Sequence, residues 1–355
     1  MKSAIRMNSM PSKLSFGIIV TGLLAIFVLS AGRIYAVSSA QESSEGVTSF
    51  RPVHTYSIVA RDSITGEIGV AVQSHWFSVG TVVTWAEAGL GAVATQSLAE
   101  ISYGPLGLEL MRAGKSADRA LHALLRADDH PEWRQVAMID ASGQVAVHTG
   151  EKCIREAGHH VGDQYSVQAN LMEKNTVWDA MAEAYENSKG DLAERMLAAL
   201  EAAQKEGGDI RGKQSAAIII VTGKSSGRSY MDRVVDLRVE DHPEPVKELK
   251  RLVQVNRAYE FMNDGDERVA MGDIKGAMDA YSKAMDLAPG NPEVQFWAAV
   301  TMFTEGNERE ALKYFREVFR VDRRWVEVVR RLPEAGLLPA DEKQIRKIMS
   351  VAPKW

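Results

Sequence analysis

The sequence predicts a chain of two parts: an α+β domain of two packed sheets between helical layers, followed by an all-α module of helical repeats. Three observations predict this architecture. Residues 54–243 alternate between strand-like runs joined by short turns and amphipathic helical segments. From about residue 244 no strand signal remains, and two later segments match each other at an offset of 34 residues. The 355 residues are enough for two separate cores.

The domain opens with three strand-like runs. Residues 54–62 and 67–76 flank "SITG", which is typical of a hairpin turn. The third run, residues 81–97, contains glycines where a bulge or a tight turn would be needed. Apolar residues at helical spacing follow, and we expect Gly114 to divide two helices and Ser116 to cap the second.

The second half of the domain repeats this order. Residues 134–150 predict two strands joined by "ASG", and residues 165–170 predict a short strand. A helical pair follows, with Thr176 and Asp191 as caps and Gly207 as the stop. Two further strands lie in "SAAIIIVT" and "YMDRVVDLRVED".

This order predicts the layers. Strands joined by short hairpins form antiparallel sheets, and helices placed between groups of strands cover the outer faces of those sheets. We therefore expect residues 54–243 to form two packed sheets flanked by helices. A single mixed sheet with helices on one side is the alternative.

The C-terminal part carries an internal repeat. Segments starting at Ala258 and Pro292 align with Gly272 opposite Gly306, and their second helices share small and aromatic positions. A 34-residue period with these features is the tetratricopeptide pattern. We expect residues 258–323 to form two antiparallel helix pairs.

The repeat pattern also predicts which side chains meet. Ala277, Tyr281, Ala311 and Phe315 are expected at the helix contacts, since small residues let helices approach and aromatic rings fill the gaps. We expect residues 244–257 to form a connecting helix before a repeat module at 258–355, a module that binds a protein or peptide partner.

The N-terminal residues have a different composition. Lys2, Arg6 and Lys13 precede an apolar run at residues 16–32, and small residues follow. This order is typical of a secretory signal, and we expect residues 1–40 to be a signal peptide or, alternatively, a membrane anchor, with residues 41–53 as a linker. The rest of the chain is then extracytoplasmic, either periplasmic or secreted.

Overall composition excludes some classes of function. The net charge of −5 and the pI near 6.0 give no electrostatic footprint for nucleic acid. The single cysteine, Cys153, allows no disulfide within the chain, and we expect it to be a buried small side chain rather than a nucleophile.

Five segments carry a family resemblance: "TYSIVARDSITGEIGVAVQSHWFSVG", "GLGAVATQSLAEISYGPLGLELM", "HTGEKCIREAGHHVGDQYSVQANLM", "RGKQSAAIIIV" and "DLRVEDHPEPVKELKRL". They closely resemble the bacterial and archaeal family called domain of unknown function 1028, over residues 54 to about 252. That family is grouped with the N-terminal nucleophile hydrolases, so the resemblance implies a four-layer αββα sandwich and an amidohydrolase-like activity.

The resemblance also implies a nucleophile. In such folds a Thr, Ser or Cys becomes the first residue by cleavage, and its free α-amine acts as the base. Many family members begin Met-Thr-Phe-Ser, and the matching residue here is Thr55. This chain carries an extension, so the mechanism needs a cut between His54 and Thr55 that the predicted signal cleavage does not supply. Ser57 is the second candidate. Successive side chains of a strand point to opposite faces, so Thr55 and Ser57 share one face and Tyr56 lies on the other.

Other polar residues cluster at predicted strand ends, where they either satisfy loop backbone or line a cleft. Asn170, or backbone amides in nearby turns, would supply oxyanion donors. The candidates for substrate binding are Gln73, Ser74, His75, Thr95, Gln96, His148, Gln168 and Arg211. The alternative for Arg211 is a solvated loop.

Neither a metal nor a cofactor is predicted. His159, His160 and Asp163 lie close together in the sequence, but no further ligand follows them at a spacing typical of a metal site. We expect them in a loop with satisfied hydrogen bonds. Two classes of function stay open: an exported amidohydrolase acting on an unknown amide, and a non-catalytic extracytoplasmic binding or scaffold protein for peptide or cell-envelope components.

Overall fold

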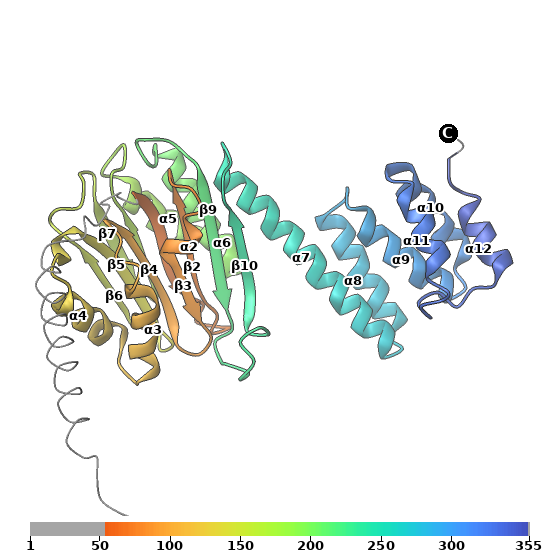
Figure 1. The fold of residues 1–355 in the computed structure, drawn as a ribbon, viewed down its shortest axis with the longest axis horizontal. Coiled ribbons are helices and arrows are strands. Elements are labelled where there is room, and N and C mark those ends of the chain that lie inside the picture. The colour runs from red at the N-terminus through yellow and green to blue at the C-terminus, as the bar shows by residue number, and fades with distance from the viewer. Residues whose placement is uncertain (1–53, 354–355) are drawn as a thin grey trace, which may run out of the picture. The chain divides into compact units, whose positions relative to one another are not determined.

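The computed structural model describes residues 54–353, so the predicted signal segment and linker lie outside the described residues. The described part contains two antiparallel sheets, followed by a helical module (Figure 1). One sheet has six strands in the order β10-β9-β2-β1-β8-β7, and the other has four in the order β3-β4-β5-β6. The strands are β1 (Thr55–Arg61), β2 (Ile68–Ser74), β3 (Thr84–Glu87), β4 (Gly91–Ser97), β5 (Arg134–Asp140), β6 (Val145–Thr149), β7 (Gly158–Gly162), β8 (Tyr165–Ala169), β9 (Ser215–Val221) and β10 (Arg233–Val239).

The core between the two sheets is apolar along most of its length. Val59, Val70 and Ile219 from the six-stranded sheet pack there with Ala94 and Ile139 from the four-stranded sheet. All are small or β-branched side chains, which suit a face covered by a second sheet.

Helices cover both outer faces, so the domain has four layers (Figure 1). Helices α5 (Val177–Asn187) and α6 (Leu192–Lys205) pack on the six-stranded sheet, where residues such as Tyr56 and Met196 meet. Helices α3 (Tyr103–Arg112) and α4 (Ala117–Ala127) pack on the four-stranded sheet. The αββα sandwich is confirmed, and the alternative of one mixed sheet is wrong.

Local signals predicted several element ends. Gly114 has φ +80° between α3 and α4, and Ser116 Oγ accepts the Arg119 N–H at the start of α4. Asp191 caps α6 in the same way. Thr176 precedes α5 but makes no capping bond, because its hydroxyl donates to the Glu206 carboxylate instead.

Two strand predictions were wrong. The run at residues 81–97 is a hairpin of β3 and β4, preceded by the short helix α2 (Gly80–Val83), rather than one strand, although the tight turn expected at its glycines is present, with Gly89 at φ +73°. Gly91, at φ +157°, has no room for a side chain, since a Cβ there would stand 2.2 Å from Ile139 O. Residues 158–162, expected in a loop, form the edge strand β7 and pair with β8.

The helical module begins with one long helix. The predicted boundary between residues 257 and 258 falls inside α7 (Pro245–Ala270), whose first turns pack on β9 and β10. The other helices are α8 (Ile274–Leu287), α9 (Pro292–Thr304), α10 (Glu308–Val321), α11 (Arg324–Arg331) and α12 (Glu342–Met349).

The predicted helix pairs are present, α7 against α8 and α9 against α10. Ala277, Tyr281, Ala311 and Phe315 are all buried at the expected contacts. Gly272 and Gly306 follow the first helix of each pair with φ of +78° and +81°, the left-handed conformation that ends a helix.

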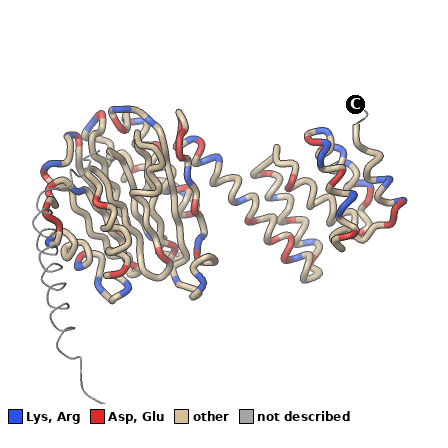
Figure 2. The backbone as a smooth tube through the Cα atoms, viewed as in Figure 1, with Lys and Arg blue, Asp and Glu red and all other residues tan. Residues whose placement is uncertain are grey.

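Lys and Arg positions are interspersed with Asp and Glu positions along the described backbone (Figure 2). Among residues 54–353, no helix is both long and apolar enough to cross a bilayer.

Candidate functional site

The layer between the two sheets becomes polar at the end where β1 begins. Side chains alternate between the two faces of each strand. On the inward face they are polar at this end and apolar farther along the same strands. Each of these side chains is fully buried, which requires hydrogen-bond partners. We call the seven residues the polar cluster: Thr55, Ser57, Ser74, Gln96, Gln135, Gln168 and Asn170.

Gln135, the first inward residue of β5, sets the direction of the hydrogen bonds. Its Nε2 donates to two backbone carbonyls, Gly158 O at 3.1 Å and Ala169 O at 2.9 Å. Because a carbonyl only accepts, the Gln135 amide oxygen must face the other way and accept. It accepts from Gln96 Nε2 at 2.7 Å and from Asn170 Nδ2 at 2.9 Å.

This direction fixes the role of Ser57. With its amide nitrogen turned to Gln135, Gln96 offers its oxygen to Ser57 Oγ, which donates to it at 2.6 Å. Gln168 Nε2 donates to the same hydroxyl at 2.6 Å. The proton of Ser57 is therefore committed to a neutral amide, and neither partner is a base that would activate it.

Thr55 lies beside Ser57 on the inward face of β1 and opposite Ser74 of β2. Its backbone carbonyl accepts the Asn170 N–H at 3.1 Å and Gln96 Nε2 at 3.3 Å. The start of β1 is thus held from both sheets, because Asn170 follows β8 and Gln96 belongs to β4.

The residue before Thr55 is bound at its carbonyl. His54 O accepts Ser74 Oγ at 2.5 Å and Arg211 Nη2 at 2.9 Å. Arg211 is itself held by Asp209, a buried carboxylate that accepts from the same guanidinium nitrogen at 2.7 Å. Arg211 thus lies at the site with its charge paired, rather than in the solvated loop that was the alternative.

The side chain of His54 is also bound. Its Nδ1 lies 2.9 Å from Asn170 Oδ1, and only 2% of the residue is exposed. Since Asn170 turns its nitrogen to Gln135, the oxygen facing His54 must accept, so the ring carries its proton on Nδ1. Burial lowers the pKa of His54 and the positive charge of Arg211 lowers it further, which outweighs the opposing hydrogen bond from Asn170. The imidazole is therefore neutral at pH 7.

Three predicted substrate-binding residues do not join the polar cluster, because strand alternation turns them outward. Gln73 pairs with Tyr56 on the helix-covered face, and neither of its buried amide atoms has a hydrogen-bond partner. Thr95 faces α3 and donates to Glu100 O, and His148 Nε2 lies 2.8 Å from Pro131 O. His75 follows Ser74 at the rim, where its ring is exposed and its backbone N–H donates to Asp209.

Gln135 is the member of the cluster that sequence reasoning missed. The signal that would have found it is alternation: along β5, Ala137 and Ile139 face the other sheet, so Gln135 does too. A glutamine that faces inward at the end of a buried strand must find hydrogen-bond partners within the protein, whereas a loop residue can bond to water.

The histidines expected in a loop lie on strand β7. His159 Nδ1 lies 2.9 Å from Thr149 Oγ1, and burial together with His148 and His160 lowers the pKa of His159. His160 Nδ1 lies 3.1 Å from Asp179. Within residues 54–353, no group of three or more His, Cys, Asp or Glu side chains is arranged to hold a metal ion.

Cys153 lies near the same end of the four-stranded sheet. Its Sγ donates to Arg134 O at 3.4 Å, and burial raises the pKa of the thiol. A protonated, buried thiol is a poor nucleophile.

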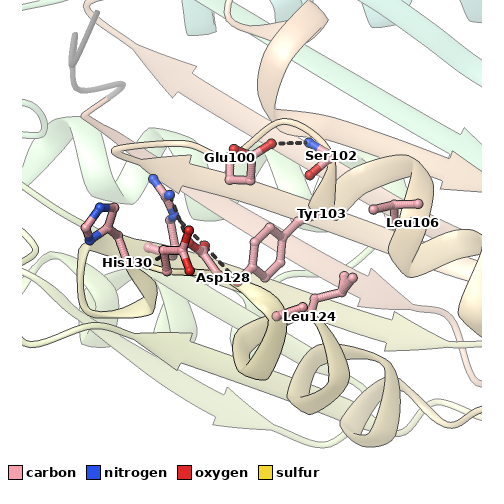
Figure 3. Close-up of a pocket in the computed structure, with 10 residues that line it drawn as sticks. Glu100, Ser102, Tyr103, Leu106, Leu124, Asp128 and His130 are labelled. Atoms are coloured by element: carbon pink, nitrogen blue, oxygen red, sulfur yellow. Dashed lines mark hydrogen bonds and ion pairs between the residues drawn. The ribbon is translucent and has the colours of Figure 1, made fainter. Parts of the chain in front are cut away.

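A cavity of about 360 Å³ opens on the outer face of the four-stranded sheet (Figure 3). Tyr103 and Arg134 both donate to Asp128 in its wall, at 3.0 and 2.7 Å. Burial alone would raise the pKa of Asp128, but these bonds and the His130 N–H outweigh it and hold that pKa below its ordinary value. No residue of the polar cluster lines this cavity, so the two are separate features.

Comparison with known proteins agrees with both parts of the fold. The family model described as "Family of unknown function (DUF1028)" matches residues 55–249, and a tetratricopeptide repeat model matches residues 268–332. No curated protein matches the chain.

The similar solved structures include a member of the same family and an ancestral beta-subunit. Protein SPO2555 from Silicibacter pomeroyi, assigned to the same family, is 30% identical, with a TM-score of 0.50 over 57% of this chain and 88% of that chain. Anbu, an ancestral beta-subunit from Yersinia bercovieri, is 14% identical, with a TM-score of 0.29 over 56% of this chain and 92% of that chain.

Proposed function

This chain belongs to the family of unknown function DUF1028, and we propose that it is an exported amidohydrolase of the N-terminal nucleophile type. Thr55 is its nucleophile, and the substrate is an amide. The observation that carries the proposal is the position of Thr55 at the start of a central strand, inside a buried polar cluster.

The chemistry requires a cut between His54 and Thr55. Once free, the α-amine of Thr55 has an ordinary pKa of ~7.7–8.0 and is partly neutral near pH 7, so it accepts the proton of its own hydroxyl. The alkoxide attacks the amide carbon, the C–N bond breaks, and the leaving amine takes the proton. Water then hydrolyses the ester formed on Thr55, which releases the acid.

Ser74 and Arg211 support the charged stage of this reaction. Both donate to the backbone carbonyl oxygen of His54, the residue directly before Thr55. Donors aimed at the oxygen of a tetrahedral intermediate are a large source of catalysis in acyl transfer. Asn170, a candidate oxyanion donor, donates its side-chain N–H to Gln135 and turns its oxygen toward His54, so we assign its side chain a positioning role.

The test compares a chain that begins at Thr55 with the same chain carrying Thr55→Ala, against a panel of small amides. We expect hydrolysis by the first, and a loss of up to about 10⁶-fold in the second, since it lacks the nucleophile. Full-length protein should be inactive, because its Thr55 nitrogen is an amide without basicity. Equal rates in the two shortened chains would remove Thr55 from the mechanism.

The second candidate is a non-catalytic binding or scaffold protein. In the full chain the Thr55 nitrogen is bound to His54, and the tetratricopeptide repeats belong to a class that generally mediates protein–protein contacts. An N-terminus near Gln41 in the mature protein would favour this function. We also propose an extracytoplasmic location, on the basis of the basic, apolar and small segments in residues 1–40.

A further inference from the structure

We infer that the place occupied by His54 is the acyl subsite, and that it selects an acyl residue with an N–H donor three bonds from its α-carbon. Histidine and asparagine have such a donor, Nδ1 in one and Nδ2 in the other. This inference rests on the proposed function, because it names the class of amide that the same site would take.

The position of the subsite follows from covalent geometry. The carbonyl carbon of His54 is bonded to the nitrogen of Thr55, so it already lies beside the hydroxyl that would attack an acyl carbon. Its oxygen is held by Ser74 Oγ at 2.5 Å and by Arg211 Nη2 at 2.9 Å. A substrate carbonyl bound by the same two donors would present its carbon to Thr55 in the geometry that a reaction needs.

The selectivity follows from Asn170. Its amide nitrogen is turned toward Gln135, whose own orientation is set by the carbonyls of Gly158 and Ala169. Asn170 Oδ1 therefore remains an acceptor 2.9 Å from the ring nitrogen of His54. An acyl residue without a donor at that point leaves a buried amide oxygen unpaired, which lowers affinity by about 10- to 100-fold.

The first experiment uses the full-length chain and does not depend on activity. His54→Gly removes the side chain and leaves room for one imidazole, with imidazole itself as the probe. We expect imidazole to raise the melting temperature of His54→Gly and not that of the wild type. Combining His54→Gly with Asn170→Leu should abolish the response. An equal response without Asn170, or stabilisation by the apolar probe cyclopentane as large as by imidazole, would overturn the inference.

A second pair of variants keeps the test decisive if His54→Gly does not fold. His54→Asn and His54→Asp are nearly the same size, but only asparagine can donate to Asn170 Oδ1 at neutral pH. The asparagine variant should melt at the higher temperature at pH 7. The reverse order would contradict the selection of a donor.

The third measurement uses whichever form of the chain hydrolyses the amide panel. N-acetylasparagine amide and N-acetylhistidine amide should be cleaved with kcat/KM about 10- to 100-fold above N-acetylaspartate amide and N-acetylleucine amide. Hydrolysis without this preference overturns the subsite and leaves the proposed function standing. Imidazole binding that depends on Asn170, in a chain that hydrolyses no amide, would show a pocket that selects an N–H donor but would overturn both its role as an acyl subsite and the proposed function.

Discussion

Ser57 and Thr55 carry similar hydroxyls on one face of one strand, yet their surroundings differ. Ser57 donates to Gln96 and accepts from Gln168, each at 2.6 Å, so its hydroxyl joins amides from both sheets. Thr55 is bonded through its nitrogen to the His54 carbonyl, whose oxygen accepts hydrogen bonds from Ser74 and Arg211. The first arrangement stabilises the sandwich, and the second suits acyl transfer.

Ser57→Ala should therefore destabilise the domain more than it affects chemistry. The change leaves the Gln96 oxygen and a Gln168 N–H buried without partners, which costs about 1–3 kcal/mol in the free energy of unfolding. Urea denaturation of the full-length chain measures this, with the exposed Ser63→Ala as the control. A Ser57→Ala chain as stable as the wild type would show that the bonds to Gln96 and Gln168 contribute little.

His54 should make stability depend on pH. Its pKa is lowered in the folded chain, so below the unfolded value of ~6.5 the unfolded state binds more protons. The contribution of the neutral His54 ring to the free energy of unfolding is fully present above about pH 6.5 and is lost as the pH falls toward the folded pKa. The facing charges are Arg211 and Asp209.

Melting temperatures between pH 8 and pH 5 measure this effect. We expect the full-length chain to lose stability on acidification and His54→Gln, which keeps an N–H donor but does not titrate, to lose less. Identical pH profiles would show that His54 is not the group responsible.

At the scale of single elements, Gly265 shows how packing overrides helix propensity. It lies inside α7, where alanine is ordinarily favoured by about 1 kcal/mol. A Cβ at this position would stand 2.5 Å from the ring of Tyr281, which is buried and held through its hydroxyl by Asp266 at 2.6 Å. The ring fills the space that the glycine leaves open.

Gly265→Ala should thus destabilise the helical module by about 1–3 kcal/mol despite the gain in propensity. Thermal unfolding followed by circular dichroism gives the measurement. Gly290→Ala is the control, because nothing lies within 4 Å of a Cβ there. Adding Tyr281→Leu should remove most of the penalty from Gly265→Ala, and a simple sum of the two effects would argue against the contact.

At the scale of the whole molecule, the question is where the mature chain begins. His54 and Thr55 are 2% and 0% exposed, so a protease in solution cannot reach the bond between them in the folded domain. The cut is then made before folding is complete or by groups of the chain itself.

Mass spectrometry of the protein recovered from its own cells decides this point. We expect a chain beginning at Thr55, after a first cut that removes residues 1–40. A chain that begins near Gln41 and keeps His54 would argue against the free-amine mechanism and in favour of the binding function.

The order and periodicity of the sequence signals indicated two packed sheets flanked by helices, several element ends and the helical repeats. Alternation in residues 54–62 placed Thr55 and Ser57 on one face, and a 34-residue offset placed Ala277 and Ala311 at equivalent contacts. These are local properties, because the faces of a strand or helix follow from spacing alone. The family resemblance added Thr55 as the candidate nucleophile.

Only the tertiary structure decided which polar strand ends meet. Alternation alone puts Thr95 and Gln96 on opposite faces of β4, but it does not say that the partner of Gln96 is Gln135 from the neighbouring strand. The direction of every bond from Gln135 to His54 follows from two backbone carbonyls, Gly158 O and Ala169 O. Such a network depends on which groups face one another across two sheets, and no spacing along the chain records that.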